Sequence, residues 1–145
     1  MKSVIFVCLG NICRSSLAEG VAKSRAKVMG LDIKIESAGL SRYHNGEAPC
    51  PLSVALAKRH GIDISMQSSQ HVSAFDLKAF DLVVALDSSN EEELNFMGLT
   101  NVKKLGDFGF RGKDVADLYY NPEKEDEVWE MVSAGVDQIL KRDNA

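Results

Sequence analysis

A cysteine, five intervening residues, an arginine and a serine stand near the start of the chain, at Cys8, Arg14 and Ser15. An apolar run at residues 4–7 precedes them, and residues 16–29 have the apolar spacing of a helix. The motif is therefore expected in the turn between a strand and a helix. Such a turn directs backbone N–H groups and the positive end of a helix dipole towards one point. The pattern predicts a cradle for a phosphate dianion with a thiol at its base.

The residue types inside this turn have separate expected roles. The planar guanidinium of Arg14 can bind two phosphate oxygens at once, and positive surroundings favour the nucleophilic thiolate of Cys8. Gly10 is expected to let the backbone approach the phosphate closely and to accept unusual dihedral angles, and Asn11 to tolerate a left-handed turn. Ser15 is expected to donate a hydrogen bond to the cysteine sulfur. The predicted phosphate-binding residues are Leu9, Gly10, Asn11, Ile12, Cys13, Arg14 and Ser15. The alternative is an ordinary buried cysteine in a tight turn, which the glycine, the asparagine and the placement disfavour.

A second group of residues supplies a candidate proton donor. Asp117 precedes Tyr119 and Tyr120 in a polar segment near the C-terminus, and a loop at that sheet edge can reach the first turn. A thiolate attack on a phosphate ester needs a general acid for the departing oxygen, and we assign this role to Asp117. The two tyrosines are expected to form pocket walls for a phenyl ring. Asp107 and Asp114 are rival acids, and the alternative is a surface loop whose tyrosines pack on the final helix.

The composition excludes several classes of protein. A length of 145 residues predicts a single domain over residues 1–145, and a net charge of −4 argues against nucleic acid as a partner. The apolar runs are too short to cross a membrane, and no secretory signal is evident. Three cysteines do not make a disulfide framework, which favours a reducing cytoplasm. The cysteines and histidines lack paired metal-ligand spacing, so we expect neither a metal nor another cofactor.

Strand and helix patterns alternate along the chain. We expect strands at residues 3–7, 33–36, 82–86 and 102–105, and helices at residues 16–29, 51–60, 89–97 and 121–142. A serine at position 88 or 89 with a glutamate three residues later predicts a capping box. This order is typical of an α/β fold, a four-stranded parallel sheet flanked by helices on both faces. The phosphate-binding loop after the first strand then lies at the sheet edge where such folds bind ligands.

With these motifs in place, the chain resembles the low-molecular-weight protein tyrosine phosphatases. Residues 7–15 match the most diagnostic motif of that family, and residues 117–120 resemble its Asp-Pro-Tyr-Tyr acid loop. Shorter similarities fall at residues 37–39, 60–62, 80–81 and 87–90. The resemblance implies a metal-free reaction in two steps. Cys8 would attack phosphorus, Arg14 would hold the equatorial oxygens, and Asp117 would protonate the leaving phenol oxygen and later activate water.

The resemblance also implies partners and marks departures. Phosphotyrosine-containing proteins would be substrates, a cognate tyrosine kinase is a candidate partner, and a monomer is expected. Leu118 replaces the family's usual proline, so the acid loop loses a fixed φ and is expected to be less pre-organised. Tyr43 stands at the pocket rim where many relatives carry tryptophan, which could change the selectivity for rings. Ser16 replaces a common proline at the start of the first helix.

Three rival activities stay open at this point. Arsenate reduction needs two further cysteines, which residues 82–89 lack. Phosphoarginine hydrolysis is associated with a threonine where this chain has Ile12. A non-catalytic phosphotyrosine-binding module would lack the nucleophile or the acid, and both are present.

The sequence gives less information about the remaining cysteines, about Asp87 and about the histidines. Cys13 either forms a reversible disulfide with Cys8 or fills space beneath the loop. Cys50 is interpreted as an incidental loop thiol, and Asp87 as a supporting, capping residue near the site. For the histidines we expect an exposed loop position at His44, with contact to substrate at the pocket rim as the alternative, and structural roles at His60 and His71.

Overall fold

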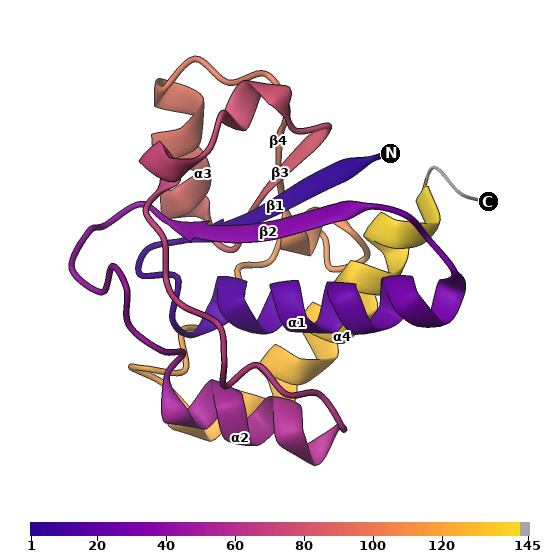
Figure 1. Cartoon of the computed structure of the whole chain (residues 1–145). Helices are drawn as coiled ribbons and strands as arrows, with labels where there is room; N and C mark the ends of the chain where they lie inside the picture. The colour runs from indigo at the N-terminus through magenta and orange to yellow at the C-terminus, as the bar shows by residue number, and fades with distance from the viewer. Residues whose placement is uncertain (143–145) are drawn as a thin grey trace.

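Four parallel strands form the centre of the protein. The computed structural model describes residues 1–142, with strands β1 (Ser3–Cys8), β2 (Lys34–Gly39), β3 (Leu82–Ala85) and β4 (Val102–Lys104). Their order across the sheet is β2-β1-β3-β4, and each neighbouring pair is parallel (Figure 1). The expected four-stranded parallel sheet is therefore confirmed.

Helices cover both faces of this sheet, as predicted. The α-helices are α1 (Arg14–Met29), α2 (Pro51–Arg59), α3 (Ser88–Phe96) and α4 (Glu125–Arg142). Short 3-10 helices lie at η1 (Val72–Ala74), η2 (Leu77–Ala79), η3 (Leu105–Asp107) and η4 (Pro122–Lys124). In Figure 1, α1, α2 and α4 lie on one side of the sheet and α3 lies on the other.

Alternate residues of β1 belong to two different hydrophobic cores. Val4 and Phe6 are fully buried against α1 and α4, whereas Ile5 and Val7 are fully buried in the core beneath α3. A strand that is buried on both faces has a continuous apolar sequence, which explains the run at residues 4–7. The strand holds the loop that follows it at a fixed place because neither of its faces is free.

Several element ends differ from the sequence-based expectations. Strand β2 continues to Gly39 and so carries Ser37 and Ala38 to the sheet edge. Asp87, rather than a serine, caps α3, and its Oδ1 accepts from the N–H of Asn90 at 2.8 Å. The expected capping box was wrong because a carboxylate one residue earlier makes that bond. Residues 122–124 form a 3-10 turn before α4 begins at Glu125.

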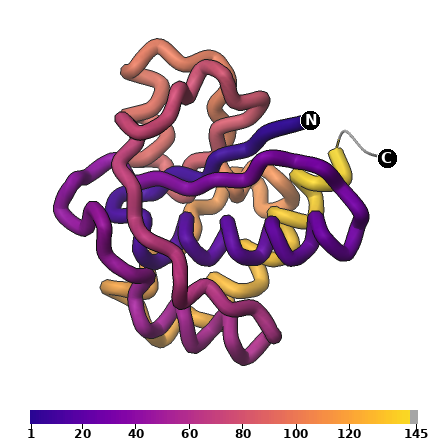
Figure 2. The backbone as a smooth tube through the Cα atoms, viewed as in Figure 1, coloured from indigo at the N-terminus to yellow at the C-terminus, as the bar shows by residue number. Residues whose placement is uncertain are grey.

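Strands are added to the sheet on both sides of β1. Strand β2 pairs with one edge of β1, and the chain then crosses to the other edge to form β3 and β4. This crossover creates the switch point at which open parallel sheets bind ligands. Figure 2 shows the loops after β1 and β2 at the same end of the sheet. No helix within residues 1–142 is long and apolar enough to cross a membrane.

Candidate active site

Three segments enclose one pocket at the carboxyl end of β1. The pocket has a volume of about 460 Å³ and is lined by the loop after β1, the loop after β2 and the segment that begins at Asp117. Every residue predicted as catalytic or as a pocket wall lines it: Cys8, Arg14, Asp117, Tyr43, Tyr119 and Tyr120. Of the predicted phosphate-binding residues, Leu9, Gly10, Ile12 and Cys13 also line it. Asn11 and Ser15 support the loop from behind.

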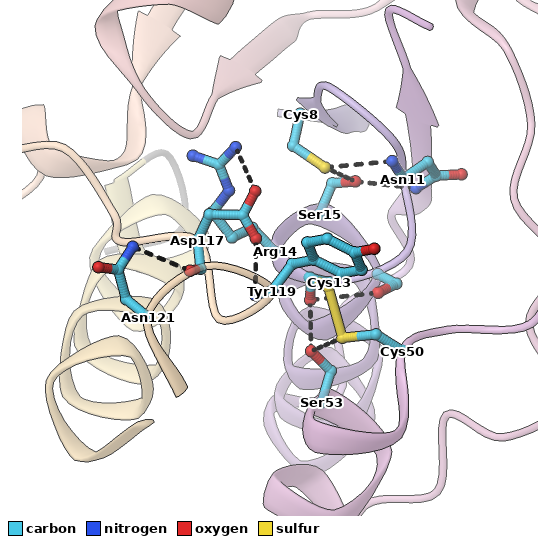
Figure 3. The surroundings of a disulfide bond; sticks show 11 residues. Cys8, Asn11, Cys13, Arg14, Ser15, Cys50, Ser53, Asp117, Tyr119 and Asn121 are labelled. Carbon is cyan, nitrogen blue, oxygen red and sulfur yellow. Dashed lines mark hydrogen bonds and ion pairs between the residues drawn. A yellow bond between two sulfur atoms is a disulfide. The ribbon is translucent and has the colours of Figure 1, made fainter. Parts of the chain in front are cut away.

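The thiol of Cys8 lies at the base of this pocket and is only 3% exposed. Its sulfur receives a hydrogen bond from the backbone N–H of Asn11 at 3.3 Å and lies 3.0 Å from the Ser15 hydroxyl (Figure 3). The predicted contact between Ser15 and the sulfur is therefore present. Helix α1 begins at Arg14, and N–H groups in the first turn of a helix lack acceptors within that helix. The sulfur thus lies where several hydrogen-bond donors converge, and such a position favours a negatively charged group.

Asn11 fixes the shape of the loop. Its φ of 58° lies in the left-handed region, as its residue type predicted. Its side-chain N–H₂ donates to the hydroxyls of Ser15 at 2.8 Å and Ser37 at 2.9 Å, and its carbonyl oxygen accepts from the N–H of Gln70. One amide therefore connects the loop after β1 to β2 and to the chain beyond α2. Gly10, by contrast, does not have a positive φ, so the expectation of an unusual conformation there was wrong.

Two glycines matter because of close packing. A Cβ on Gly10 would lie 3.1 Å from the His44 ring, and one on Gly39 would lie 3.0 Å from the Gly10 carbonyl carbon. The loop after β1 therefore rests directly on the end of β2. The close neighbour of Gly10 here is the His44 side chain, and the approach of the Gly10 backbone to a phosphate stays a prediction.

A buried carboxylate extends the hydrogen bonds behind the loop. The hydroxyl of Ser37 donates to Glu19, whose side chain is 11% exposed and pairs with Lys23 at 2.7 Å. The sequence analysis missed Glu19 and Ser37 as parts of the site. The only available signal was the similarity of residues 37–39 to the family pattern, because nothing in a helix spacing marks Glu19 as buried.

Arg14 is buried at 5% exposure and is held on two sides. One terminal nitrogen, Nη1, donates to Asp87 Oδ2 at 2.6 Å and to the Val115 carbonyl at 3.1 Å, while Nη2 lies 3.5 Å from Asp117 Oδ2. Burial by itself would lower the pKa of Arg14, but the nearby charges of Cys8 and Asp87 raise it above its ordinary value. The guanidinium is therefore a permanent cation in the pocket wall.

The Nε atom of Arg14 is the unpartnered donor of the site. It is buried and has no hydrogen-bond partner among the described residues. Buried donors in proteins are nearly always satisfied, so a buried donor without a partner beside a pocket indicates a place for an external acceptor. An oxyanion bound above Cys8 would supply that acceptor, and a guanidinium edge matches its geometry.

Asp87 is a supporting residue, as expected. Its Oδ1 caps α3 and its Oδ2 holds Arg14, so one carboxylate joins the start of a helix to the predicted phosphate-binding arginine. The side chain does not line the pocket.

Asp117 faces Arg14 from the opposite side. Its side chain is 24% exposed, and Oδ1 accepts from the N–H of Tyr119 at 3.0 Å. The rival acids are engaged elsewhere: Asp114 binds Lys104 and Ser88, and Asp107 accepts from the N–H of Lys104. Neither rival lines the pocket, so Asp117 is the one of the three candidate acids that the structure places in the pocket with Cys8 and Arg14.

Leu118 holds the acid segment in place. Its side chain is 1% exposed and belongs to the larger hydrophobic core. The chain lacks the family's proline at this position, but the burial of a leucine side chain anchors the segment instead. The expected loss of pre-organisation is thus offset by packing.

Three tyrosines form an exposed rim. Tyr43, Tyr119 and Tyr120 are 84%, 60% and 73% exposed, and the last two rings pack edge to face with centroids 5.0 Å apart. His44 also lines the pocket, edge to face with Tyr43 at 4.7 Å. Of the two interpretations of His44, the structure favours the position at the pocket rim; the nearby Ser41, which also lines the pocket, was not predicted.

Both interpretations of Cys13 and the interpretation of Cys50 were wrong. Cys13 forms a disulfide with Cys50, with the two Cα atoms 5.3 Å apart (Figure 3). The N–H of Cys50 also donates to the Ile12 carbonyl at 2.7 Å, and the Ser53 hydroxyl donates to the Cys13 carbonyl at 2.9 Å. These bonds fasten the start of α2 to the loop, and Cys8 is the free cysteine.

The two remaining histidines have structural surroundings, as expected. His60 stacks on Trp129 with ring centroids 3.7 Å apart, and His71 caps η1.

A parallel α/β sheet with a thiol beneath a helix N-terminus, a buried arginine and an opposing carboxyl group defines a cysteine-based oxyanion-binding protein. Comparisons with known proteins identify the family. The model of the low molecular weight phosphotyrosine protein phosphatase family matches residues 3–144. The chain therefore belongs to the low molecular weight phosphotyrosine protein phosphatases.

Individual relatives agree over nearly the whole chain. The low molecular weight protein-tyrosine-phosphatase YfkJ of Bacillus subtilis is 36% identical over 97% of this chain and 94% of its own. Its crystal structure matches with a TM-score of 0.89 over 98% of this chain and 94% of that one. The protein-tyrosine-phosphatase PtpA of a Staphylococcus aureus strain is 36% identical over 97% of this chain and 92% of its own. The Drosophila arginine phosphatase DARP is 26% identical, with a TM-score of 0.87 over 100% of this chain and 97% of that one.

Proposed function

We propose that the protein hydrolyses phosphotyrosine and small aryl phosphates through a phosphocysteine intermediate. The observation that carries this proposal is the buried Arg14 Nε without a partner, beside the Cys8 thiol and opposite Asp117. A bound phosphate would satisfy this donor and would lie between a nucleophile and an acid. Family membership supports the same reaction.

In the first step, Cys8 acts as the nucleophile. Its thiolate forms a bond to phosphorus while the bond from phosphorus to the aryl oxygen breaks. Asp117 donates its proton to the departing oxygen, so that a neutral phenol leaves. Arg14 and the loop N–H groups hold the three equatorial oxygens and stabilise the negative charge that is spread over them in the transition state.

In the second step, water replaces the cysteine. Asp117, now ionised, accepts a proton from the attacking water, the new oxygen–phosphorus bond forms and the sulfur–phosphorus bond breaks. The Ser15 hydroxyl, 3.0 Å from the sulfur, stabilises the departing thiolate. Inorganic phosphate leaves, and the starting thiolate is restored.

The pocket wall favours an aryl substrate over phosphoarginine. Phosphoarginine is a candidate because a structural neighbour is described as an arginine phosphatase. In this chain, however, the apolar side chain of Ile12 lines the pocket and three tyrosines form its rim. The apolar side chain of Ile12 and the tyrosine ring faces pack well against a phenyl ring, whereas Ile12 offers a guanidinium no hydrogen-bond acceptor.

The proposal is tested by steady-state kinetics on three substrates: p-nitrophenyl phosphate, a phosphotyrosine peptide and phosphoarginine. We expect turnover of the first two, abolition by Cys8→Ser, and a loss of ~100-fold with Asp117→Ala, within the usual range for general acid catalysis. Asp76→Ala removes a carboxylate that lies outside the pocket and makes no capping bond, and it is the matched control. Turnover of phosphoarginine alone, or full activity in the Cys8 variant, would contradict the proposal.

The proposal extends to partners and location. We expect phosphotyrosine-containing proteins as physiological substrates, an opposing tyrosine kinase, a monomeric state and a cytoplasmic location. Substrate trapping with the Asp117→Ala variant is the experiment that identifies the substrates.

A further inference from the structure

Lys104 lies at the end of β4 and binds two other segments. Its side chain is 12% exposed, and its Nζ donates to Asp114 Oδ1 at 2.9 Å, to the Ser88 hydroxyl at 3.0 Å and to the Gly112 carbonyl. The backbone N–H of the same lysine donates to Asp107. All three donors of the ammonium group are therefore used.

Asp114 and Ser88 complete a three-residue cluster with Lys104. The Oδ1 atom of Asp114 also accepts from the backbone N–H of Ser88 at 3.0 Å and from its hydroxyl at 2.9 Å. The cluster thus joins β4, the first residue of α3 and the segment that leads to Leu118. We call these three residues the Lys104 cluster.

The cluster joins the two segments whose carboxylates flank Arg14. Ser88 directly follows Asp87, which binds Arg14 Nη1, and Asp114 precedes Asp117, which faces Arg14 Nη2, by three residues. A backbone hydrogen bond also joins these two segments, because the N–H of Val115 donates to the Leu86 carbonyl at 2.9 Å. None of the three cluster residues lines the pocket. The cluster therefore cannot act by contact with a bound substrate, and its direct connection to the site is through the backbone that carries Asp87 and Asp117.

Charges within the cluster reinforce its hydrogen bonds. The hydrogen bond to Asp114 raises the pKa of Lys104. Burial would raise the pKa of Asp114, but its bonds to Lys104 and Ser88 lower it below the ordinary value. Both groups are ionised near neutral pH, and the pair forms part of a network, which constrains geometry more than an isolated surface pair does.

We propose that Lys104, through Asp114 and Ser88, positions the general acid Asp117 relative to Arg14. This inference rests on the proposed phosphatase reaction. It makes Lys104 a positioning residue, since it touches neither substrate nor reacting atoms. Displacement of a reacting group by about 1 Å can cost up to ~100-fold in rate, so loosening this attachment should selectively weaken proton donation.

The leaving group distinguishes positioning of the acid from general damage. Phenol is a much weaker acid than p-nitrophenol, so phenyl phosphate depends more on a proton from Asp117. The ratio kcat/KM reports the steps through cleavage of the aryl ester bond. A displaced acid should therefore lower kcat/KM for phenyl phosphate much more than for p-nitrophenyl phosphate.

The experiment measures kcat/KM on both esters for Lys104→Met and Asp114→Asn. We expect a loss of ~10-fold on phenyl phosphate and less than ~3-fold on p-nitrophenyl phosphate. Inhibition by inorganic phosphate should change by less than ~2-fold, because Cys8 and Arg14 keep their places. Arg25→Met is the matched control, since it removes a cation that pairs at 3.5 Å with Asp137 between α1 and α4.

Further variants test whether the cluster acts as a unit. The double variant should lose little more than either single one, because both remove the same attachment, and Lys104→Arg should restore part of the loss. Asp114→Asn keeps the side-chain shape and serves as the readout if Lys104→Met does not fold. Equal losses on both esters, or no loss on either, would overturn the inference. An inactive wild-type protein would instead refute the proposed function.

Discussion

At the scale of single residues, the three cysteines have different surroundings although all are buried. Cys8 receives hydrogen bonds at the base of the pocket, whereas Cys13 and Cys50 are joined to each other. The disulfide joins Cys13, the N-cap residue of α1, to Cys50, the N-cap residue of α2, which lies 37 residues later in the chain. A cross-link over such a distance restricts the unfolded chain considerably.

Replacing Cys50 should therefore lower stability only under oxidising conditions. We expect Cys50→Ser to reduce the free energy of unfolding by about 3 kcal/mol when wild type is oxidised, a decrease in Tm of roughly 6–12 °C. Thermal unfolding with and without dithiothreitol measures this difference. Wild type and variant should unfold close together in the reductant, and a gap of equal size there would mean that lost packing, and not the cross-link, is responsible.

The roles of single residues could be predicted where chemistry depended on local spacing. The contact of Cys8 with Ser15 and the place of Arg14 in the same pocket follow from positions within eight residues of each other. The Cys13–Cys50 bond could not be found in this way, because α1, β2 and a loop separate the two cysteines and three cysteines allow three pairings. Glu19 could not be found either, because its burial depends on Ser37 from another element.

At the scale of elements, the segment carrying Asp117 lacks regular secondary structure before η4 yet is attached at several points. The N–H of Val115 donates to the carbonyl of Leu86, directly after β3, and the side chain of Leu118 is buried in the core. The Asp117 carbonyl accepts from the N–H of Asn121 at 2.9 Å. A short irregular segment can thus hold a carboxyl group in place without a proline.

Truncating this anchor should affect both stability and catalysis. We expect Leu118→Ala to lower the free energy of unfolding by ~2–5 kcal/mol, the usual cost of such a cavity. It should also reduce kcat/KM on phenyl phosphate, because Asp117 is the adjacent residue. Leu94→Ala is the matched control, since Leu94 is fully buried in the other core.

Denaturant unfolding and kinetics on the same samples separate the two effects. The control should lose comparable stability with unchanged kcat/KM. An equal kinetic loss in both variants would show that general loosening, not displacement of the acid, lowers the rate.

The strands and helices themselves were largely predictable from the apolar pattern. Strand β1 and helix α4 have clear patterns because each buries a continuous run or stripe. The errors fall where a contact with another segment decides the end of an element. Strand β2 was expected to stop at residue 36, but pairing with β1 carries it on to Gly39. The short 3-10 helices have too few residues to produce a periodic signal.

At the scale of the whole molecule, the site joins parts of the chain that are far apart. The loops after β1 and β2 and the segment before α4 meet around one pocket. A ligand bound there contacts several structural elements at once, and it binds only to the folded protein. Binding therefore adds to global stability by mass action.

Phosphate should accordingly protect the fold against heat. At a concentration of ~100 times its Kd, inorganic phosphate should add about 2.7 kcal/mol to the free energy of unfolding, which raises Tm by roughly 5–10 °C. Differential scanning fluorimetry with chloride at matched ionic strength measures this shift. Arg14→Ala should abolish it, and an undiminished shift in that variant would place the anion elsewhere.

The pairing of two cysteines also has a practical consequence. With Cys13 and Cys50 joined, the folded chain presents a single thiol, and that thiol lies at the floor of the pocket. A fluorescent maleimide added to oxidised protein should give at most one label per molecule by intact mass, whereas full reduction and denaturation should give three. For oxidised protein, labelling stoichiometry therefore counts the molecules whose pocket is open and whose Cys8 thiol is free, without an activity assay.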